Sequence, residues 1–115
     1  MQLTTRKTDT GLVIRVEESR IDAAVAIEFK EAVRRAANGS GNPVILDLSQ
    51  VTFLDSSGLG AVVAVMKLLA PERVLELAGL TPSVGRVFRL TRMDSVFTIH
   101  PRAPGSADPA LKATG

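Results

Sequence analysis

Hydrophobic and polar positions follow two kinds of pattern along this chain. Short apolar or alternating stretches predict strands, and apolar residues spaced by three or four predict helices. Val25, Phe29 and Val33, for example, fall on one stripe of a helix that is otherwise largely polar. The predicted strands are Gln2–Thr8, Leu12–Glu17, Val44–Leu48, Val74–Ala78 and Val96–Ile99, and the predicted helices are Ala23–Ala37, Ser57–Leu69 and Thr81–Arg92.

The connections between these elements indicate how they assemble. Asp9–Gly11 predicts a hairpin turn, and Arg20–Asp22 predicts a connection with Asp22 as the N-cap of the first helix. The order β-β-α-β-α-β-α-β predicts an α/β fold. We expect a mostly parallel central sheet with an N-terminal antiparallel hairpin strand and helices packed on it. Val44–Leu48 should be the central strand because it is apolar on both faces.

The length of 115 residues suits one domain with a single core. We expect that domain to span residues 1–100. From Pro101 onward the composition shifts to proline, alanine, glycine and serine. Residues 101–115 are therefore predicted to form a flexible C-terminal tail, with a helical turn near Asp108–Lys112.

Composition argues against several classes of function. The chain has no cysteine and one histidine, His100, so we expect no disulfide, no metal site and no cofactor. The N-terminus lacks the apolar core of a signal peptide, and no apolar run reaches the roughly 18 residues of a membrane helix. The net charge of +2 and the absence of tyrosine and tryptophan leave little material for stacking nucleic-acid bases. We therefore expect a cytoplasmic protein that binds neither membranes nor nucleic acid.

The most informative segment is Val51-Thr-Phe-Leu-Asp-Ser-Ser-Gly-Leu-Gly60. It places Asp55, Ser56 and Ser57 where a short apolar stretch gives way to a helix. Their oxygens can accept hydrogen bonds from free N–H groups of the first turn, so all three could simply be caps. The same N–H groups favour an added anion, so a serine here could also be a phosphorylation switch. No lysine follows Gly58 and Gly60, so they more readily let another backbone come close than hold a phosphate.

This segment, following Val44–Leu48, resembles the signature of the STAS domain and, more narrowly, that of bacterial anti-sigma factor antagonists. The element order resembles theirs over about residues 2–100, and Pro82–Phe88 also matches. The family often has Gly-Glu-Leu-Asp before the first helix, whereas this chain has Ser19-Arg-Ile-Asp22. The family also usually ends in a fourth helix, for which residues 101–115 are a poor candidate.

The resemblance implies a regulator that acts by binding, with no catalytic residues of its own. In the family, the serine directly after the aspartate is phosphorylated by an anti-sigma factor with serine kinase activity, and a serine phosphatase reverses this. The matching residue here is Ser56. The unphosphorylated protein would bind the anti-sigma factor and release its target. The residues implied to contact this partner are Asp22, Asp55, Ser56, Ser57, Gly58, Leu59 and Gly60.

Two other functions remain open from the sequence. One is a STAS scaffold or accessory module that binds a partner without phosphate control. The other is a serine hydrolase, which would need a base beside Ser56 or Ser57. The only histidine, His100, lies at the start of the predicted tail, and the G-x-S-x-G motif is absent.

Overall fold

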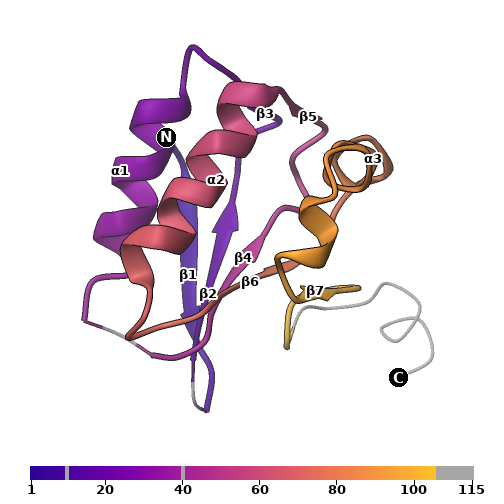
Figure 1. Cartoon of the computed structure of the whole chain (residues 1–115). Coiled ribbons are helices and arrows are strands. Elements are labelled where there is room, and N and C mark those ends of the chain that lie inside the picture. The colour runs from indigo at the N-terminus through magenta and orange to yellow at the C-terminus, as the bar shows by residue number, and fades with distance from the viewer. Residues whose placement is uncertain (10, 40, 106–115) are drawn as a thin grey trace, which may run out of the picture.

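The computed structural model describes residues 1–9, 11–39 and 41–105. Within them, a five-stranded sheet with the order β1-β2-β4-β6-β7 runs behind the helices in the view of Figure 1. The β1–β2 pair is antiparallel, and the other neighbours are parallel. The predicted fold class is confirmed, with β4 as the central strand. The strands are β1 (Leu3–Lys7), β2 (Leu12–Val16), β4 (Val44–Asp47), β6 (Leu75–Ala78) and β7 (Ile99–His100).

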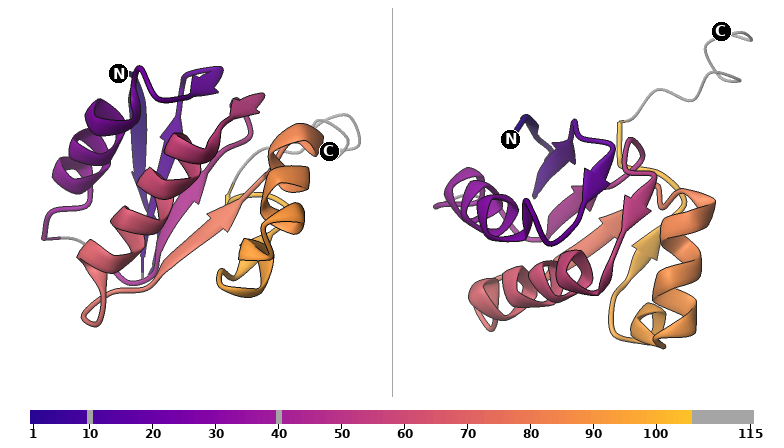
Figure 2. Two further views of the ribbon diagram at one scale, coloured as in Figure 1. Left: turned by 45° about the horizontal axis from the view of Figure 1, so that its top comes forward. Right: turned by 90° about the horizontal axis from the view of Figure 1, so that it is seen from above.

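The helices pack on one face of this sheet, as the view from above makes clear (Figure 2). Side chains alternate across a strand, so Ile14, Leu46 and Leu77 point toward the helices. There they pack with Phe29 and Phe88 in a fully buried core. The helices are α1 (Ala26–Ala36), α2 (Ser56–Leu69) and α3 (Pro82–Leu90), followed by the 3-10 helix η1 (Met93–Ser95).

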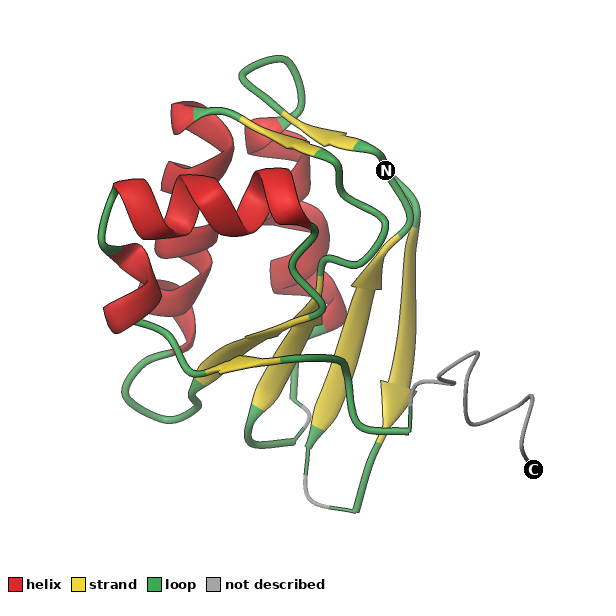
Figure 3. Ribbon diagram, turned by 90° about the vertical axis from the view of Figure 1, so that its right-hand side faces the viewer, coloured by secondary structure: helices red, strands yellow, loops and turns green. Residues whose placement is uncertain are grey.

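The opposite face of the sheet is covered in part by the chain that follows β7. Figure 3 shows this segment crossing the strands toward β1. Ala103 is buried at 3% exposure and forms a small apolar cluster with Val13, Ile45 and Ala78. Packing on the sheet thus continues past the last strand. The helical turn predicted near Asp108–Lys112 lies outside the described residues.

A second, much smaller sheet lies near the start of α2. β3 (Arg20–Ile21) and β5 (Phe53–Leu54) pair in parallel, with Arg20 opposite Phe53 and Ile21 opposite Leu54. Arg20–Asp22 was predicted as a connection, and this prediction was wrong for its first two residues. Two residues are too few to show the alternation that identifies a strand in a sequence.

Most element boundaries differ from the prediction by a single residue, and three elements differ by more. α1 begins at Ala26, because residues 23–25 form a separate turn. α3 ends at Leu90 with Thr91 as its C-cap, and the next residue, Arg92, has a left-handed φ of 61°. The last strand is Ile99–His100 instead of Val96–Ile99. The apolar Phe97 that suggested a strand instead packs edge-to-face on Phe88, with 5.9 Å between ring centroids.

Candidate functional site

The predicted site lies where β5 passes into α2. Asp55 has an extended backbone and is the N-cap of α2. The Gly58 N–H donates to its Oδ1 atom at 2.8 Å, which supplies one of the acceptors that a helix start needs. The structural role expected for Asp55 is thus confirmed. Ser56 and Ser57 are the first two residues of the helix, so the alternative that either is the N-cap is wrong.

Asp55 also joins two parts of the chain that are distant in sequence. The Ala23 N–H donates to its Oδ2 atom at 3.1 Å, which ties the turn before α1 to the start of α2. These bonds lower the pKa of Asp55, and the largest contribution comes from the Gly58 N–H. The carboxylate is therefore ionised at neutral pH, with both oxygens engaged.

Asp22 forms hydrogen bonds within the turn at residues 23–25, which Asp55 also contacts. The Ala24 N–H donates to its Oδ1 atom at 3.1 Å, and the Val25 N–H donates to its carbonyl oxygen. This local hydrogen bonding keeps residues 23–25 outside the helix. The prediction of Asp22 as the N-cap of α1 was therefore wrong; that position is occupied by Val25, which provides no side-chain cap.

The two serines are exposed, and neither hydroxyl forms a hydrogen bond with any described residue. Ser56 is in the first turn of α2, immediately after the fixed Asp55. Ser57 lines a shallow groove between α1 and α2, together with Ile27, Lys30 and Gly60. The two serines are thus exposed to solvent. Their position is fixed by the hydrogen bonds of the adjacent Asp55.

The other predicted contact residues divide into inward and outward positions. A Cβ atom at Gly58 would lie 2.1 Å from the Ile21 carbonyl oxygen, so glycine is required by the close backbone expected there. Leu59 belongs to the hydrophobic core. Gly60 is exposed, and a Cβ atom on it would meet nothing within 4 Å. Within the described residues, no backbone lies close enough to require this second glycine.

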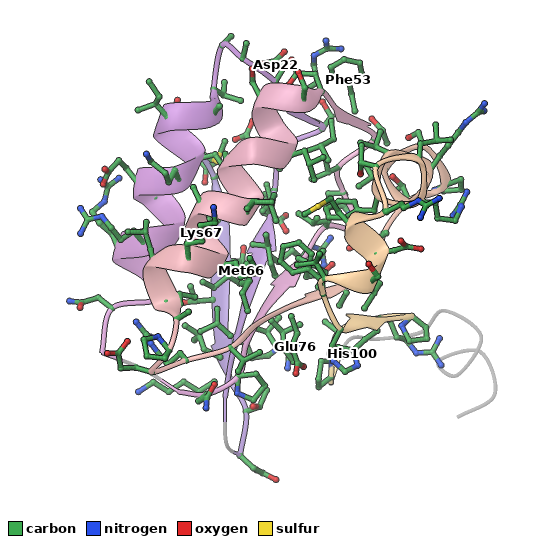
Figure 4. All side chains as sticks on the ribbon, viewed as in Figure 1. Asp22, Phe53, Met66, Lys67, Glu76 and His100 are labelled. Carbon is green, nitrogen blue, oxygen red and sulfur yellow. The ribbon has the colours of Figure 1, made fainter. Side chains whose placement is uncertain are left out.

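Sequence reasoning missed two exposed apolar residues beside the site. Phe53 is 41% exposed, and the Arg20 guanidinium lies over its ring at 4.2 Å from the centroid. Arg20 also donates from Nε to Asp22 Oδ2 at 3.3 Å. Figure 4 shows Asp22 and Phe53 at the same end of the molecule. Ile27, in the first turn of α1, is 76% exposed, and its place off the apolar stripe was readable from the sequence.

The one histidine of the chain, which a serine hydrolase would use as its base, is engaged elsewhere. His100 Nε2 lies 2.7 Å from Glu76 Oε1, across β6 and β7 (Figure 4), so it does not serve as a base for Ser56 or Ser57. Among residues 1–9, 11–39 and 41–105, no three metal-ligating side chains gather into a cluster. In the same part of the chain, no helix is both long enough and apolar enough to cross a membrane. The geometry thus favours the serines as exposed groups that another protein can reach.

Comparison with known proteins identifies a domain family and related regulators. The STAS domain model matches residues 2–104. An anti-sigma-B factor antagonist of Listeria monocytogenes is 30% identical over 95 residues, covering 82% of this chain and 83% of that protein.

Solved structures extend the comparison. The crystal structure of an anti-sigma factor antagonist from Mycobacterium paratuberculosis is 28% identical, with a TM-score of 0.76, covering 97% of this chain and 92% of that one. The murine solute carrier 26 family member A9 anion transporter shares the fold at 16% identity and a TM-score of 0.74. This match covers 95% of this chain but 18% of the transporter.

Proposed function

Because the chain belongs to the STAS domain family, we propose that it is an anti-sigma factor antagonist controlled by phosphorylation of Ser56. In this proposal the unphosphorylated protein binds an anti-sigma factor that is also a serine kinase, and so releases the factor's target. Phosphorylation ends the binding. A serine phosphatase restores the active form in the cytoplasm.

The observation that carries this proposal is the placement of Ser56. Its hydroxyl is exposed in the first turn of α2, where a kinase active site can reach it. Asp55 precedes it and is held by N–H groups from Gly58 and Ala23. Kinases supply their own base for the attacking hydroxyl, so an acceptor serine needs accessibility and no catalytic neighbour. Ser56 meets that requirement.

The cap at the helix start determines where the phosphate charge would act. Asp55 already occupies the Gly58 N–H, so a phosphate on Ser56 would not replace that bond without displacing an ionised carboxylate. The phosphate adds about two negative charges at the surface of the domain. A partner that approaches this surface with negative groups of its own would be repelled. The switch therefore works by blocking contact, with the fold kept.

Phosphorylation by the cognate anti-sigma factor tests this proposal. Purified protein is incubated with that factor and ATP, and the modified residue is mapped by mass spectrometry. We expect one phosphate on Ser56, none on Ser56→Ala, and normal uptake by Ser57→Ala. Phosphate on Ser57 alone would reverse the two assignments. Binding without any phosphorylation would support a STAS module that lacks phosphate control.

A further inference from the structure

The groove between α1 and α2 has an exposed apolar residue and a glycine that the packing of the domain does not require. Its walls carry Ile27 and Lys30 on α1, and Ser57 and Gly60 on α2. Ile27 leaves 76% of its surface exposed at this position. An apolar side chain of this size at the rim of a groove is typical of a contact with another protein.

Gly60 keeps this groove open. It lies inside α2, where glycine destabilises a helix relative to alanine. A Cβ atom at this position would meet nothing within 4 Å, whereas one at Gly58 would collide with the Ile21 carbonyl. Glycine is thus required by packing at position 58 but not at position 60. A larger side chain at position 60 would extend into the groove, so its absence leaves room for a ligand.

Lys30 gives the groove a positive charge. It is half-buried and forms no ion pair with any described residue, and its neighbour Glu31 is paired with Arg34. An unpaired cation beside apolar surface favours a ligand that presents a carboxylate next to an apolar group. The groove thus has both the shape and the charge to receive a protein segment of that kind.

The groove also adjoins the proposed phosphorylation site. Ser57 lines it directly, and Ser56 is the adjacent residue. The bond from Ala23 to Asp55 fixes the turn before α1 against the start of α2, so the two walls keep their relative position. A partner that covers Ser56 would therefore meet the groove in the same contact.

We propose that this groove receives a segment of the anti-sigma partner that carries an apolar side chain beside a carboxylate. This inference rests on the proposed function and adds the recognition element to it. Ile27 and Gly60 accept the apolar side chain, and Lys30 pairs with the carboxylate. The identity of these residues then determines which anti-sigma factor the protein selects. A phosphate on neighbouring Ser56 would repel the same carboxylate.

Filling the groove tests the inference directly. Gly60→Leu should weaken binding to the purified cognate anti-sigma factor by at least about tenfold. Its melting temperature should not fall, because leucine favours the helix and has space around its Cβ atom. Gly60→Ala provides the graded control: it should raise the melting temperature and weaken binding by a smaller factor.

Two matched pairs of variants separate the groove from the rest of the surface. Ile27→Ser should weaken binding about tenfold, whereas Leu90→Ser, at 73% exposure on α3, should have no effect. Lys30→Glu should weaken binding and make it less dependent on salt. Lys7→Glu, at an exposed position of β1, should change neither the affinity nor its salt dependence.

The outcomes distinguish the inference from the proposed function. If the wild type binds and is phosphorylated on Ser56, but Gly60→Leu and Ile27→Ser bind within twofold of it, the groove inference is wrong and the function stands. If the wild type does not bind the anti-sigma factor at all, both are wrong. A wild-type dimer that Gly60→Leu converts to monomer would identify a second copy of the chain as the occupant and overturn the inference.

Discussion

Ala23 donates its backbone N–H to the carboxylate of Asp55, 32 residues later in the chain. The second oxygen of the same carboxylate caps α2 through the Gly58 N–H. One side chain thus holds the turn before α1 and the start of α2 together. Ser56, which follows Asp55 directly, has its position fixed by this arrangement even though its own hydroxyl is unbound.

Replacing Asp55 should therefore disturb both segments. We expect Asp55→Ala to lower the melting temperature by several degrees, because it removes a helix cap and a second hydrogen bond at once. Asp55→Asn should cost less, since the amide oxygen can keep one of the two N–H groups. Thermal unfolding followed by circular dichroism measures both. Equal stability of the two variants would mean that the hydrogen bond kept by the amide oxygen contributes nothing.

Acid should remove the contribution of the Asp55 carboxylate to the stability of the fold. The pKa of Asp55 lies below its ordinary value of 3.8 because the Gly58 N–H, and then the Ala23 N–H, favour the ionised form. The unfolded chain therefore binds this proton more readily than the folded one, and the stabilisation is complete above the unfolded pKa. The advantage of the wild type over Asp55→Asn should shrink as the pH falls from 6 toward 2.5. Urea denaturation along this pH series tests it, and a constant difference would contradict it.

Changing Ser56 should separate folding from binding. Ser56→Ala should fold normally, because Ser56 makes no hydrogen bond through its hydroxyl and is exposed. It should bind the anti-sigma factor without being switched off. Ser56→Glu should bind more weakly, and full phosphorylation should reduce affinity roughly a hundredfold, about 3 kcal/mol. Isothermal titration calorimetry measures these affinities. Undiminished binding of the phosphorylated protein would remove the basis of the proposed switch.

The phosphorylated form should keep the fold. Both oxygens of Asp55 are already engaged, so the phosphate should remain at the surface instead of entering the cap. Amide chemical shifts should therefore change at residues 53–60 and in the adjacent turn at residues 22–25. Shifts spread through the sheet and across α3 would indicate a conformational switch in place of blocked contact.

The segment after β7 offers a test of the opposite face of the sheet. Ala103→Asp should lower the free energy of unfolding by about 1–3 kcal/mol, because it places a charge in the buried cluster with Val13, Ile45 and Ala78. Pro104→Asp, at an exposed neighbouring position, serves as the control. Equal stability of the two variants would mean that Ala103 packs too loosely to matter.

Much of the fold was predictable because its helices and central strand have clear apolar patterns. The central strand was recognisable from its apolar residues on both faces, and α2 from the apolar run after Ser57. The pair of β3 and β5 was not, because each strand has two residues and their pairing depends on contacts more than 30 positions apart. The turn at residues 23–25 was missed because local hydrogen bonds to Asp22 overrode helical spacing.

The position of the site was predictable, but the contacts that hold it were not. The residue types Asp55, Ser56 and Ser57 identified the junction, but the second bond of Asp55 to Ala23 could be found only in three dimensions. Phe53 has the hydropathy of a core residue, and its exposure under Arg20 follows from the small sheet. Gly58 and Gly60 look alike in the sequence. They differ only in what surrounds each one, the Ile21 carbonyl in the first case and open space in the second.

That difference between two neighbouring glycines bears on how this protein could evolve. Under selection for a folded domain alone, position 58 would admit no substitution, while position 60 would drift freely and even favour larger residues. Under selection for partner recognition, both positions would be held. A library randomised at the two codons and sorted once for folding and once for binding would thus measure, at a single residue, how far the needs of recognition depart from those of stability.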